Sequence, residues 1–213
     1  MADDRQLQKV TAFITRGLPE PREILVIRHP VAGLQVPAGT VEASETPRAA
    51  VLREAGEETG LKQLGIIALL NSRRVEFAAD EGLMFADALL QLTPDYSSTV
   101  VTSFILRRGM RVKLLDSEGN FLRIAYEEET YRDGGRNVKG RHTGWVVQSS
   151  VTRTVVRHFF HLMASDDTAA EWRVLGDMDL TFSCSWQPLQ ADLNLLPPQD
   201  EWLRTHYGRL TQP

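Results

Sequence analysis

The chain has 213 residues, of which 42% are hydrophobic and 24% are charged, and its formal net charge at pH 7 is −4. This length holds one large domain or two small ones, and the composition is that of an ordinary globular protein. The acidic balance and the lack of a Lys/Arg-rich run argue against a nucleic-acid-binding surface.

The cysteine content and the apolar runs indicate the compartment. A single cysteine, Cys184, rules out an intrachain disulfide framework and is typical of a reducing cytosol. The first residues, MADDRQLQK, are acidic and polar, unlike a secretory signal. The longest apolar run, Leu64 to Leu70, is too short to span a bilayer. We therefore expect a cytoplasmic protein that does not associate with membranes.

The first third of the chain predicts a helix held between strands. Residues 10–15 (VTAFIT) alternate as a strand does, and residues 23–28 (EILVIR) and 64–70 (LGIIALL) are apolar runs of strand length. Thr46-Pro47 combines a hydroxyl N-cap with a proline at the first helical position, and Gly60 is a natural helix stop. This order of elements indicates an α/β sandwich.

Three carboxylates share one face of that helix. Glu54, Glu57 and Glu58 lie at i, i+3 and i+4, where like charges repel one another. A cluster of hard oxygen ligands suits Mg²⁺ or Mn²⁺, and a bound ion would remove the repulsion. The opposite face is expected to lie against a sheet through small or apolar residues, namely Ala49, Leu52 and Gly56.

Residues 39–61, GTVEASETPRAAVLREAGEETGL, follow the pattern G-x5-E-x7-R-E-U-x-E-E-x-G-U, where U is aliphatic. EAGEE alone would suggest a solvated acidic helix, but the flanking residues change that interpretation. The stretch resembles the signature box of the Nudix hydrolase superfamily at every fixed position: Gly39, Glu45, Arg53, Glu54, Glu57, Glu58 and Gly60. The resemblance implies an α/β (α+β) fold, specifically an α/β/α sandwich. It also implies an enzyme that cleaves a nucleoside diphosphate linked to another moiety X, with Mg²⁺ or Mn²⁺ as cofactor.

The resemblance also implies roles for individual residues. The Gly39 carbonyl would join the three carboxylates as a metal ligand. The catalytic residues would be Arg53, Glu54, Glu57 and Glu58, with Arg53 orienting a glutamate of the box rather than touching substrate. Glu45 would support the site through a water molecule or by contacting the metal ligands instead of the metal ion. The general base stays open between Glu54 and carboxylates outside the box: Glu127 to Glu129, Glu171, Asp177 and Asp179.

After about residue 71 the pattern of a Nudix domain is interrupted. The best candidate for its next strand is Thr154 to Met163, followed by a strand at Thr181 to Trp186 and a helix at Pro198 to Tyr207. We therefore expect a discontinuous Nudix domain formed by residues 1–75 and 153–213. Residues 85–152 would be an inserted domain.

The inserted segment has a pattern of its own. Short strands separated by glycine turns, such as Ser117-Glu118-Gly119-Asn120, suggest a small β-barrel. Their order, with Gly144-Trp145-Val146 near the end, resembles a bacterial Src-homology-3-type barrel. An irregular elaboration with an extra hairpin is the alternative. Residues Glu127 to Gly140 are polar and glycine-rich, which predicts a mobile loop.

Several other residues are interpreted as structural. His158 and His161 are three apart on a predicted strand, so they point to opposite faces and cannot share a metal ion. Phe159 and Phe160 are expected to pack on the sheet, and Cys184 alternates with core positions and should be inert. Trp145 is expected to pack in the barrel core or against a turn, with a ligand contact as the alternative.

Three functional hypotheses follow. The first is a pyrophosphohydrolase acting on a nucleotide-derived small molecule, with the insertion as lid, substrate wall or homodimer surface. The second is a non-catalytic nucleotide sensor that binds a partner through the barrel, although a pure binder does not need three adjacent carboxylates. The third makes the barrel a peptide or glycan binder. Nucleic acid and membrane are not expected partners, and the particular nucleotide is left open.

Overall fold

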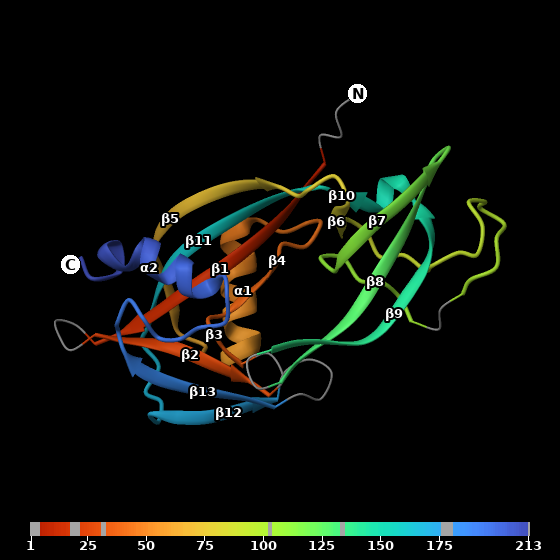
Figure 1. The fold of residues 1–213 in the computed structure, drawn as a ribbon. Helices are drawn as coiled ribbons and strands as arrows, with labels where there is room; N and C mark the ends of the chain where they lie inside the picture. The colour runs from red at the N-terminus through yellow and green to blue at the C-terminus, as the bar shows by residue number, and fades with distance from the viewer. Residues whose placement is uncertain are drawn as a thin grey trace. The chain divides into compact units, whose positions relative to one another are not determined.

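The computed structural model describes residues 5–17, 22–30, 33–101, 104–132, 135–175 and 181–212, with backbone only at 129–132, 135 and 136. The chain forms two compact units. The α/β unit comprises residues 9–73, 131–134 and 157–213, and the β unit comprises residues 1–8, 74–130 and 135–156. Figure 1 shows the elements of both units in chain order. Each unit is described by itself below.

The α/β unit contains the larger sheet, whose strand order is β12-β13-β2-β1-β11-β5, with β3 paired to β2 and β4 paired to β1. The strands are β1 (Gln6–Arg16), β2 (Glu23–His29), β3 (Gly33–Gln35), β4 (Ala38–Thr40), β5 (Leu64–Glu76), β11 (Thr154–Ala164), β12 (Glu171–Leu175) and β13 (Thr181–Pro188). Each strand predicted for this sheet from sequence is present, including β11 beside β1 despite the long stretch of chain between them.

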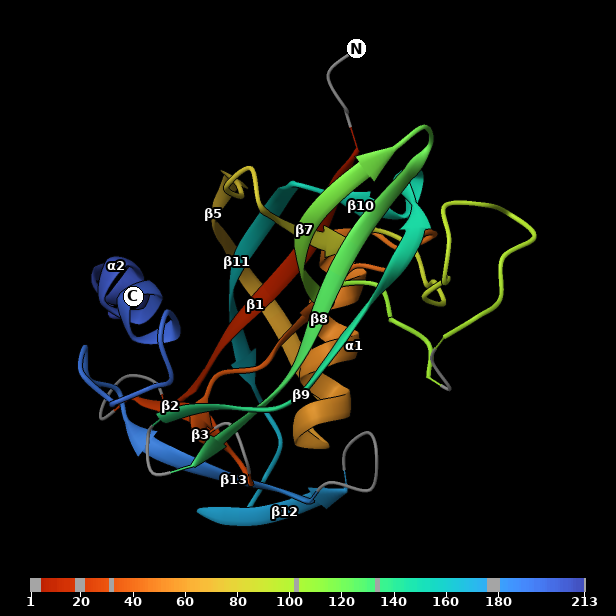
Figure 2. The same cartoon turned by 45° about the vertical axis from the view of Figure 1, so that its right-hand side comes forward.

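Two helices cover the two faces of this sheet, α1 (Pro47–Thr59) and α2 (Gln199–Leu210) (Figure 2). On the α1 face, Ala50, Val51 and Ala55 pack in one core with alternate residues of β1, β2, β11 and β13. On the α2 face, Leu203 and Leu210 pack in a second core that includes Phe13 and Phe159. Burial of apolar surface on both faces is what holds the three layers together. The predicted α/β/α sandwich is therefore confirmed.

The ends of α1 are formed as its sequence predicts. The Thr46 side chain accepts a hydrogen bond from the Ala49 N–H at 3.2 Å, and Pro47 occupies the first helical position. Gly60 adopts a φ of 74°, the left-handed conformation that favours glycine, and its N–H donates to the Gly56 carbonyl at 2.8 Å. These two caps fix which residues the helix contains.

The predicted packing face of α1 is wrong. Ala49 and Leu52 are exposed, and a Cβ on Gly56 would meet only ordinary contact distance, so close approach does not explain that glycine. The buried residues are Ala50, Val51, Ala55 and Thr59. Compared with the prediction, the buried face is rotated about the helix axis towards Glu54 and Glu58. These two carboxylates lie at the edge of the contact between α1 and the sheet, and not on the opposite side of the helix.

The β unit contains a smaller sheet with the order β10-β6-β7-β8-β9. Its elements are β6 (Glu81–Met84), β7 (Arg111–Glu118), β8 (Phe121–Arg132), β9 (Gly135–Val147), the 3-10 turn η1 (Gln148–Ser150) and β10 (Val151–Thr152). A core that includes Met84, Leu106, Ile124 and Val146 lies beneath it. The predicted turn joins β7 to β8, with Gly119 at a φ of 54°. Closure into a Src-homology-3-type barrel is not confirmed and stays a prediction.

The loop predicted at residues 127–140 is wrong, because β8 continues to Arg132 and β9 begins at Gly135. Polar residues are no obstacle to a strand when neighbouring strands satisfy the backbone hydrogen bonds and the side chains reach solvent. Glu128 and Lys139 form such a solvent-exposed pair, with Lys139 Nζ at 3.0 Å from Glu128 Oε1. Composition alone did not separate a polar hairpin from a loop.

A buried histidine gives the α/β unit a pH-dependent stability. His161 Nε2 lies 2.8 Å from the Thr15 hydroxyl, and burial lowers its pKa to about 4, with Arg22 acting in the same direction. The neutral imidazole is therefore favoured in the folded state, and the stability it contributes is present above pH 6.5 and lost as pH falls towards 4. This contribution amounts to about 3 kcal/mol at most. We expect urea unfolding to show a steeper loss of stability between pH 7 and pH 4 in the wild type than in His161→Gln. Parallel curves would contradict this origin.

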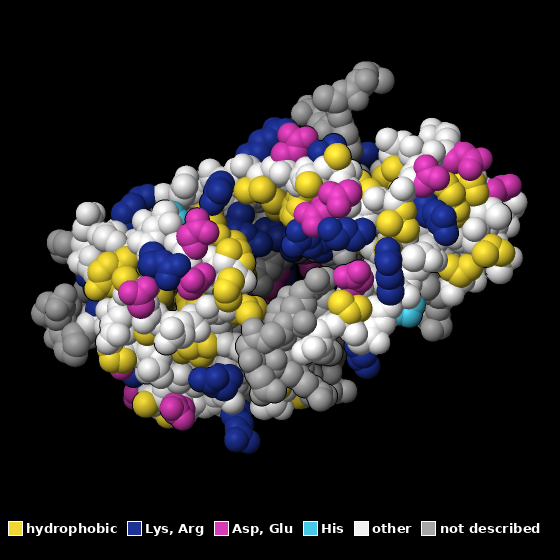
Figure 3. Space-filling model, in the orientation of Figure 1, with side chains coloured by type: hydrophobic (Ala, Val, Ile, Leu, Met, Phe, Trp, Pro, Cys, Tyr) yellow, Lys and Arg dark blue, Asp and Glu magenta, His cyan; other side chains and the backbone are white. Residues whose placement is uncertain are grey.

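The described residues contain no helix long and apolar enough to cross a membrane. Basic and acidic side chains are interspersed over the face shown in Figure 3, as the small net charge suggests.

Candidate functional site

Strand β4 places the start of the box directly against the centre of the sheet. In its antiparallel pairing with β1, Thr40 is opposite Lys9, Gly39 is opposite Val10, and Ala38 is opposite Thr11. The chain then leads to the N-cap of α1 at Thr46. Helix α1 therefore lies over the same part of the sheet as β4, and residues of the two elements can meet.

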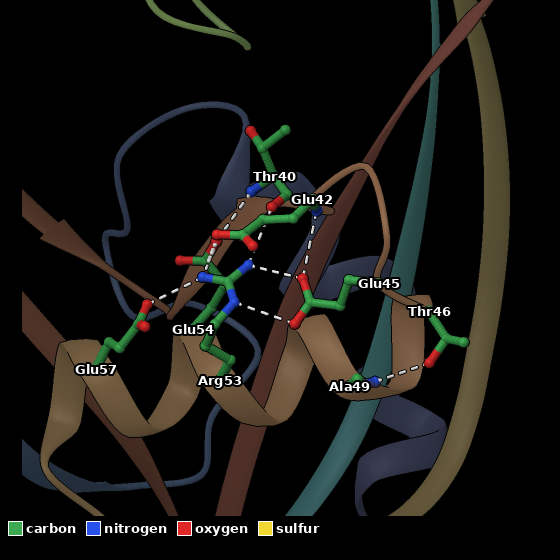
Figure 4. Close-up of polar contacts among 8 residues, drawn as sticks. All are labelled: Thr40, Glu42, Glu45, Thr46, Ala49, Arg53, Glu54 and Glu57. Atoms are coloured by element: carbon green, nitrogen blue, oxygen red, sulfur yellow. Dashed lines mark hydrogen bonds and ion pairs between the residues drawn. The ribbon is translucent and has the colours of Figure 1, made fainter.

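Two of the three predicted carboxylates reach β4. Glu54 Oε1 accepts a hydrogen bond from the Thr40 N–H at 3.1 Å (Figure 4), and Glu58 Oε2 accepts one from the Ala38 N–H at 3.1 Å. Because Glu54 and Glu58 are one helical turn apart, they bind on either side of Gly39. Main-chain donors hold both carboxylates in place.

Gly39 is required by this arrangement. A Cβ at position 39 would lie 1.8 Å from the Glu54 carboxyl carbon and 1.9 Å from its Oε1. No side chain fits at such distances, and the atoms in conflict belong to a carboxylate that the Thr40 N–H already anchors. The first glycine of the box is thus explained by space for Glu54, beside any role of its carbonyl as a ligand.

Arg53 connects the remaining acidic residues of the box (Figure 4). Its guanidinium binds Glu45 in a bidentate manner, with Nε at 3.0 Å from Oε1 and Nη2 at 2.9 Å from Oε2. Nη1 lies 3.0 Å from Glu57 and 3.1 Å from Glu54, and Nη2 donates to the Thr40 carbonyl at 3.2 Å. Arg53 therefore contacts Glu45, Glu54 and Glu57, and the roles expected for Arg53 and Glu45 in the site stay predictions.

The pKa values of these groups reflect the same contacts. Hydrogen bonding to Arg53 lowers the pKa of Glu45 and, in return, raises the pKa of Arg53. Burial raises the pKa of Glu54, and the positive charge of Arg53 only partly opposes that effect. A half-buried carboxylate whose charged form is disfavoured gains from a nearby cation. Glu57 differs, since 59% of its side chain is exposed.

The donor set fits Mg²⁺ by its chemistry. In the described residues, no three His, Cys, Asp or Glu side chains already converge on one point. Mg²⁺ does not need such a cage, because it usually binds through one or two carboxylates and keeps waters or substrate phosphates as its other ligands. Glu54 and Glu58 flank the Gly39 segment, and Glu57 is solvent-accessible beside them. Only oxygen donors are involved, as Mg²⁺ and Mn²⁺ prefer.

The candidate bases outside the box lie on several different elements. Glu128 pairs with Lys139 in the β unit, and Glu127 lies one residue before it on β8. Glu171 is an exposed residue of β12, opposite Ser185. Asp177, Asp179 and the side chain of Glu129 lie outside the described residues. The general base therefore stays a hypothesis, with Glu54 among the candidates.

The residues interpreted as structural lie in different surroundings. His161 is buried against Thr15, whereas His158 Nδ1 contacts the Ser72 hydroxyl at 2.8 Å, so the two histidines have different surroundings. Phe159 packs with α2 and Phe160 with the core on the α1 face. Burial raises the pKa of Cys184 to about 12, which keeps the thiol protonated and unreactive.

Two charged residues at inward strand positions were not singled out from the sequence, Lys9 on β1 and Arg157 on β11. Both lie on strands whose neighbouring positions are mostly apolar, and both side chains are half-buried. A lysine and an arginine at inward positions of central strands are uncommon. Their occurrence in mostly apolar strands was the sequence feature that could have drawn attention to them.

Comparison with known families and proteins agrees with the site. A family model described as NUDIX domain matches residues 8–88, a range that contains the whole box, most of β1 and all of β2 to β5. A search of curated proteins gave no match. The family is one of pyrophosphohydrolases that generally use divalent metal ions. The family match, the α/β/α sandwich and the arrangement of the box together support assignment of residues 8–88 to the Nudix superfamily.

Proposed function

We propose that this protein is a Mg²⁺-dependent pyrophosphohydrolase that cleaves a nucleoside diphosphate linked to another moiety X. The observation that carries the proposal is the placement of Glu54 and Glu58 on either side of Gly39, each anchored by a main-chain N–H of β4. A purely structural acidic helix would leave its carboxylates in solvent, whereas here two of them are brought to one strand.

The reaction that suits this site is hydrolysis of a phosphoanhydride. The metal ion, when bound, supplies neutralisation of phosphate charge and lowers the pKa of a coordinated water. Glu54, Glu57 and Glu58 would hold the ion, with the Gly39 carbonyl as a further ligand. Arg53 keeps Glu54 and Glu57 oriented, and Glu45 keeps Arg53 in position.

The charge balance favours a cation at this cluster. Four carboxylates, from Glu45, Glu54, Glu57 and Glu58, lie on or just before α1, and Arg53 is bonded to three of them. One guanidinium is shared by Glu45, Glu54 and Glu57, whose three carboxylates carry more negative charge than it offsets. Addition of a divalent ion would offset the repulsion, and it would particularly favour Glu54, whose pKa is raised by burial.

The test is phosphate release from a panel of nucleoside diphosphate derivatives, after coupled phosphatase treatment, with and without Mg²⁺ or Mn²⁺. The panel includes nucleotide sugars, ADP-ribose, dinucleoside polyphosphates, oxidised nucleotides and CoA-type molecules. We expect metal-dependent turnover of one class, abolished by a chelator. Ligand-induced stabilisation without turnover across the panel would instead favour a nucleotide sensor and would overturn the proposed hydrolase.

A further inference from the structure

The last turn of α1 carries two of the box carboxylates, Glu57 and Glu58, at a place where negative charge is unfavourable. The C-terminal end of a helix is the negative end of its dipole, so cations stabilise it and carboxylates do not. The sequence of this turn, GEET, contains no basic residue. Arg53, one turn earlier, offsets part of the charge, since its guanidinium lies 3.0 Å from Glu57. The turn therefore tends to fray unless other contacts hold it.

The main-chain carbonyls of this turn are bound by side chains from outside the helix. The last four carbonyls of a helix have no partner within it and need other donors. The Trp172 indole N–H donates to the Thr59 carbonyl at 2.7 Å, and the Cys184 thiol donates to the Glu58 carbonyl with Sγ 3.6 Å away. Since the Ala38 N–H binds the Glu58 carboxylate, Glu58 is held at both its main chain and its side chain.

The two donors come from neighbouring strands of the large sheet. Trp172 of β12 is directly opposite Cys184 of β13 in their antiparallel pairing, so the two side chains are on one face of the sheet. This is the face that α1 covers, because Cys184 is buried in the α1-face core and Trp172 packs against it. Figures 1 and 2 show β12 and β13 beside one end of α1. Strand pairing thus brings both donors to the same turn.

Both donors are uncharged, which matters beside the carboxylates. A lysine or arginine could bind the same carbonyls, but its charge would also compete with a metal ion for Glu57 and Glu58. An indole N–H carries no charge, and burial keeps the Cys184 thiol protonated by raising its pKa to about 12. Trp172 and Cys184 can therefore hold the turn without neutralising the carboxylates in it.

We propose that Trp172 and Cys184 are positioning residues, which cap the last turn of α1 and so keep Glu57 and Glu58 placed for a divalent cation. This role rests on the proposed function, because the cation is taken to be the metal ion of that site. It makes metal binding depend on two residues outside the box. Loss of either donor increases the fraction of molecules in which the turn is open, and the affinity for the cation falls with the fraction that is closed.

Amide hydrogen exchange of the full chain without metal measures the cap independently of catalysis. The reporter is the Gly60 N–H, which closes the turn on the Gly56 carbonyl at 2.8 Å. Its exchange should become roughly three- to tenfold faster in Trp172→Phe, which keeps an aromatic ring and loses the N–H, the range expected for one neutral hydrogen bond. Cys184→Ala should act in the same direction and more weakly, because a thiol is a weak donor.

Trp186→Phe is the matched control. The Trp186 indole N–H donates to the Thr168 hydroxyl at 2.9 Å and not to α1, and its ring lies in the same core, 6.2 Å from the Trp172 ring. The control therefore loses an indole and a hydrogen bond beside Trp172 without removing a donor from the helix. Its Tm should fall about as far as that of Trp172→Phe, while exchange of the Gly60 N–H should stay at the wild-type rate.

Binding of Mn²⁺ alone, followed through the paramagnetic resonance signal of the free ion, tests the consequence for the site. The dissociation constant should rise roughly two- to tenfold in Trp172→Phe and keep its wild-type value in Trp186→Phe. In turnover assays, Trp172→Phe should need more Mn²⁺ for half of its maximal rate, and the rate at saturating Mn²⁺ should equal that of the wild type.

Unchanged Mn²⁺ affinity in Trp172→Phe, with or without faster exchange at Gly60, would overturn the positioning role. An equal loss of affinity in Trp186→Phe would do the same, because the effect would then come from the core as a whole. A wild type that binds no Mn²⁺ would overturn both this role and the proposed function. A wild type that binds Mn²⁺ and hydrolyses nothing loses the proposed function alone, provided that its affinity depends on Trp172.

Discussion

Glu58→Gln is expected to reduce metal-dependent turnover by about 10³-fold, and Glu57→Gln by a similar factor, because each removes a charged ligand from the ion that stabilises the transition state. In Glu58→Gln the amide oxygen can still accept the hydrogen bond from the Ala38 N–H, so the position of the side chain is preserved while its charge is lost. Steady-state kinetics over a range of Mg²⁺ concentrations measure the effect. The activity should not return at high metal concentration if the ligand charge is needed in catalysis.

The fold should tolerate both substitutions. Loss of one like charge from α1 relieves repulsion between neighbouring carboxylates, so the metal-free Tm is expected to stay the same or rise slightly. Glu171→Gln, at an exposed residue of β12, is the matched control and should keep full activity. Full activity in Glu57→Gln and Glu58→Gln would reject the assignment of these residues as ligands.

The sequence predicted the parts of this site that depend on local rules. The Thr46 cap, the Gly60 stop and the helical spacing of the carboxylates each follow from neighbours within a few residues. Gly39 was expected to act as a metal ligand through its carbonyl. The sequence did not predict that a side chain at this position would overlap the Glu54 carboxylate. This overlap depends on the distance between a strand and a helix that are far apart in sequence, which no local pattern specifies.

The errors share the same origin. The buried face of α1 was placed opposite the carboxylates because the sequence was treated as one amphipathic helix in isolation. In the folded chain, Glu54 and Glu58 contact β4, so the observed buried face of α1 lies closer to them than the predicted one. The contact of Arg157 with Thr11 was missed because it depends on β1 and β11 being neighbours, which the sheet topology decides. Pairing of strands separated by a long insertion cannot be read from either strand alone.

Gly39→Ala is the substitution for which we expect the largest combined loss of stability and activity. The new methyl group would overlap the Glu54 carboxylate, since an ideal Cβ lies 1.8 Å from its carboxyl carbon. Glu54 must then leave the Thr40 N–H, and Arg53 loses part of its orientation. Because the atoms in conflict are the far end of a flexible side chain, the cost in folding stability is that of the lost hydrogen bond to a charged group, about 1–2 kcal/mol. Displacement of a catalytic carboxylate by roughly 1 Å can reduce turnover about 10²-fold or more. Urea unfolding and kcat/KM measure the two effects.

A double-substitution experiment identifies Glu54 as the cause. Gly39→Ala combined with Glu54→Ala removes the atoms in conflict, so most of the lost stability should return, while activity should be no higher than in Gly39→Ala because a proposed ligand is gone. Gly65→Ala is the matched control: a Cβ there would meet nothing within 4 Å, and the variant should behave as the wild type. If Gly39→Ala were as stable and as active as the wild type, the close approach of Glu54 to Gly39 would not exist in solution. If the losses of unfolding free energy in the two single variants simply added up in the double variant, the loss in Gly39→Ala would come from the strand itself. The proposed steric coupling between Gly39 of β4 and Glu54 of α1 would then be rejected.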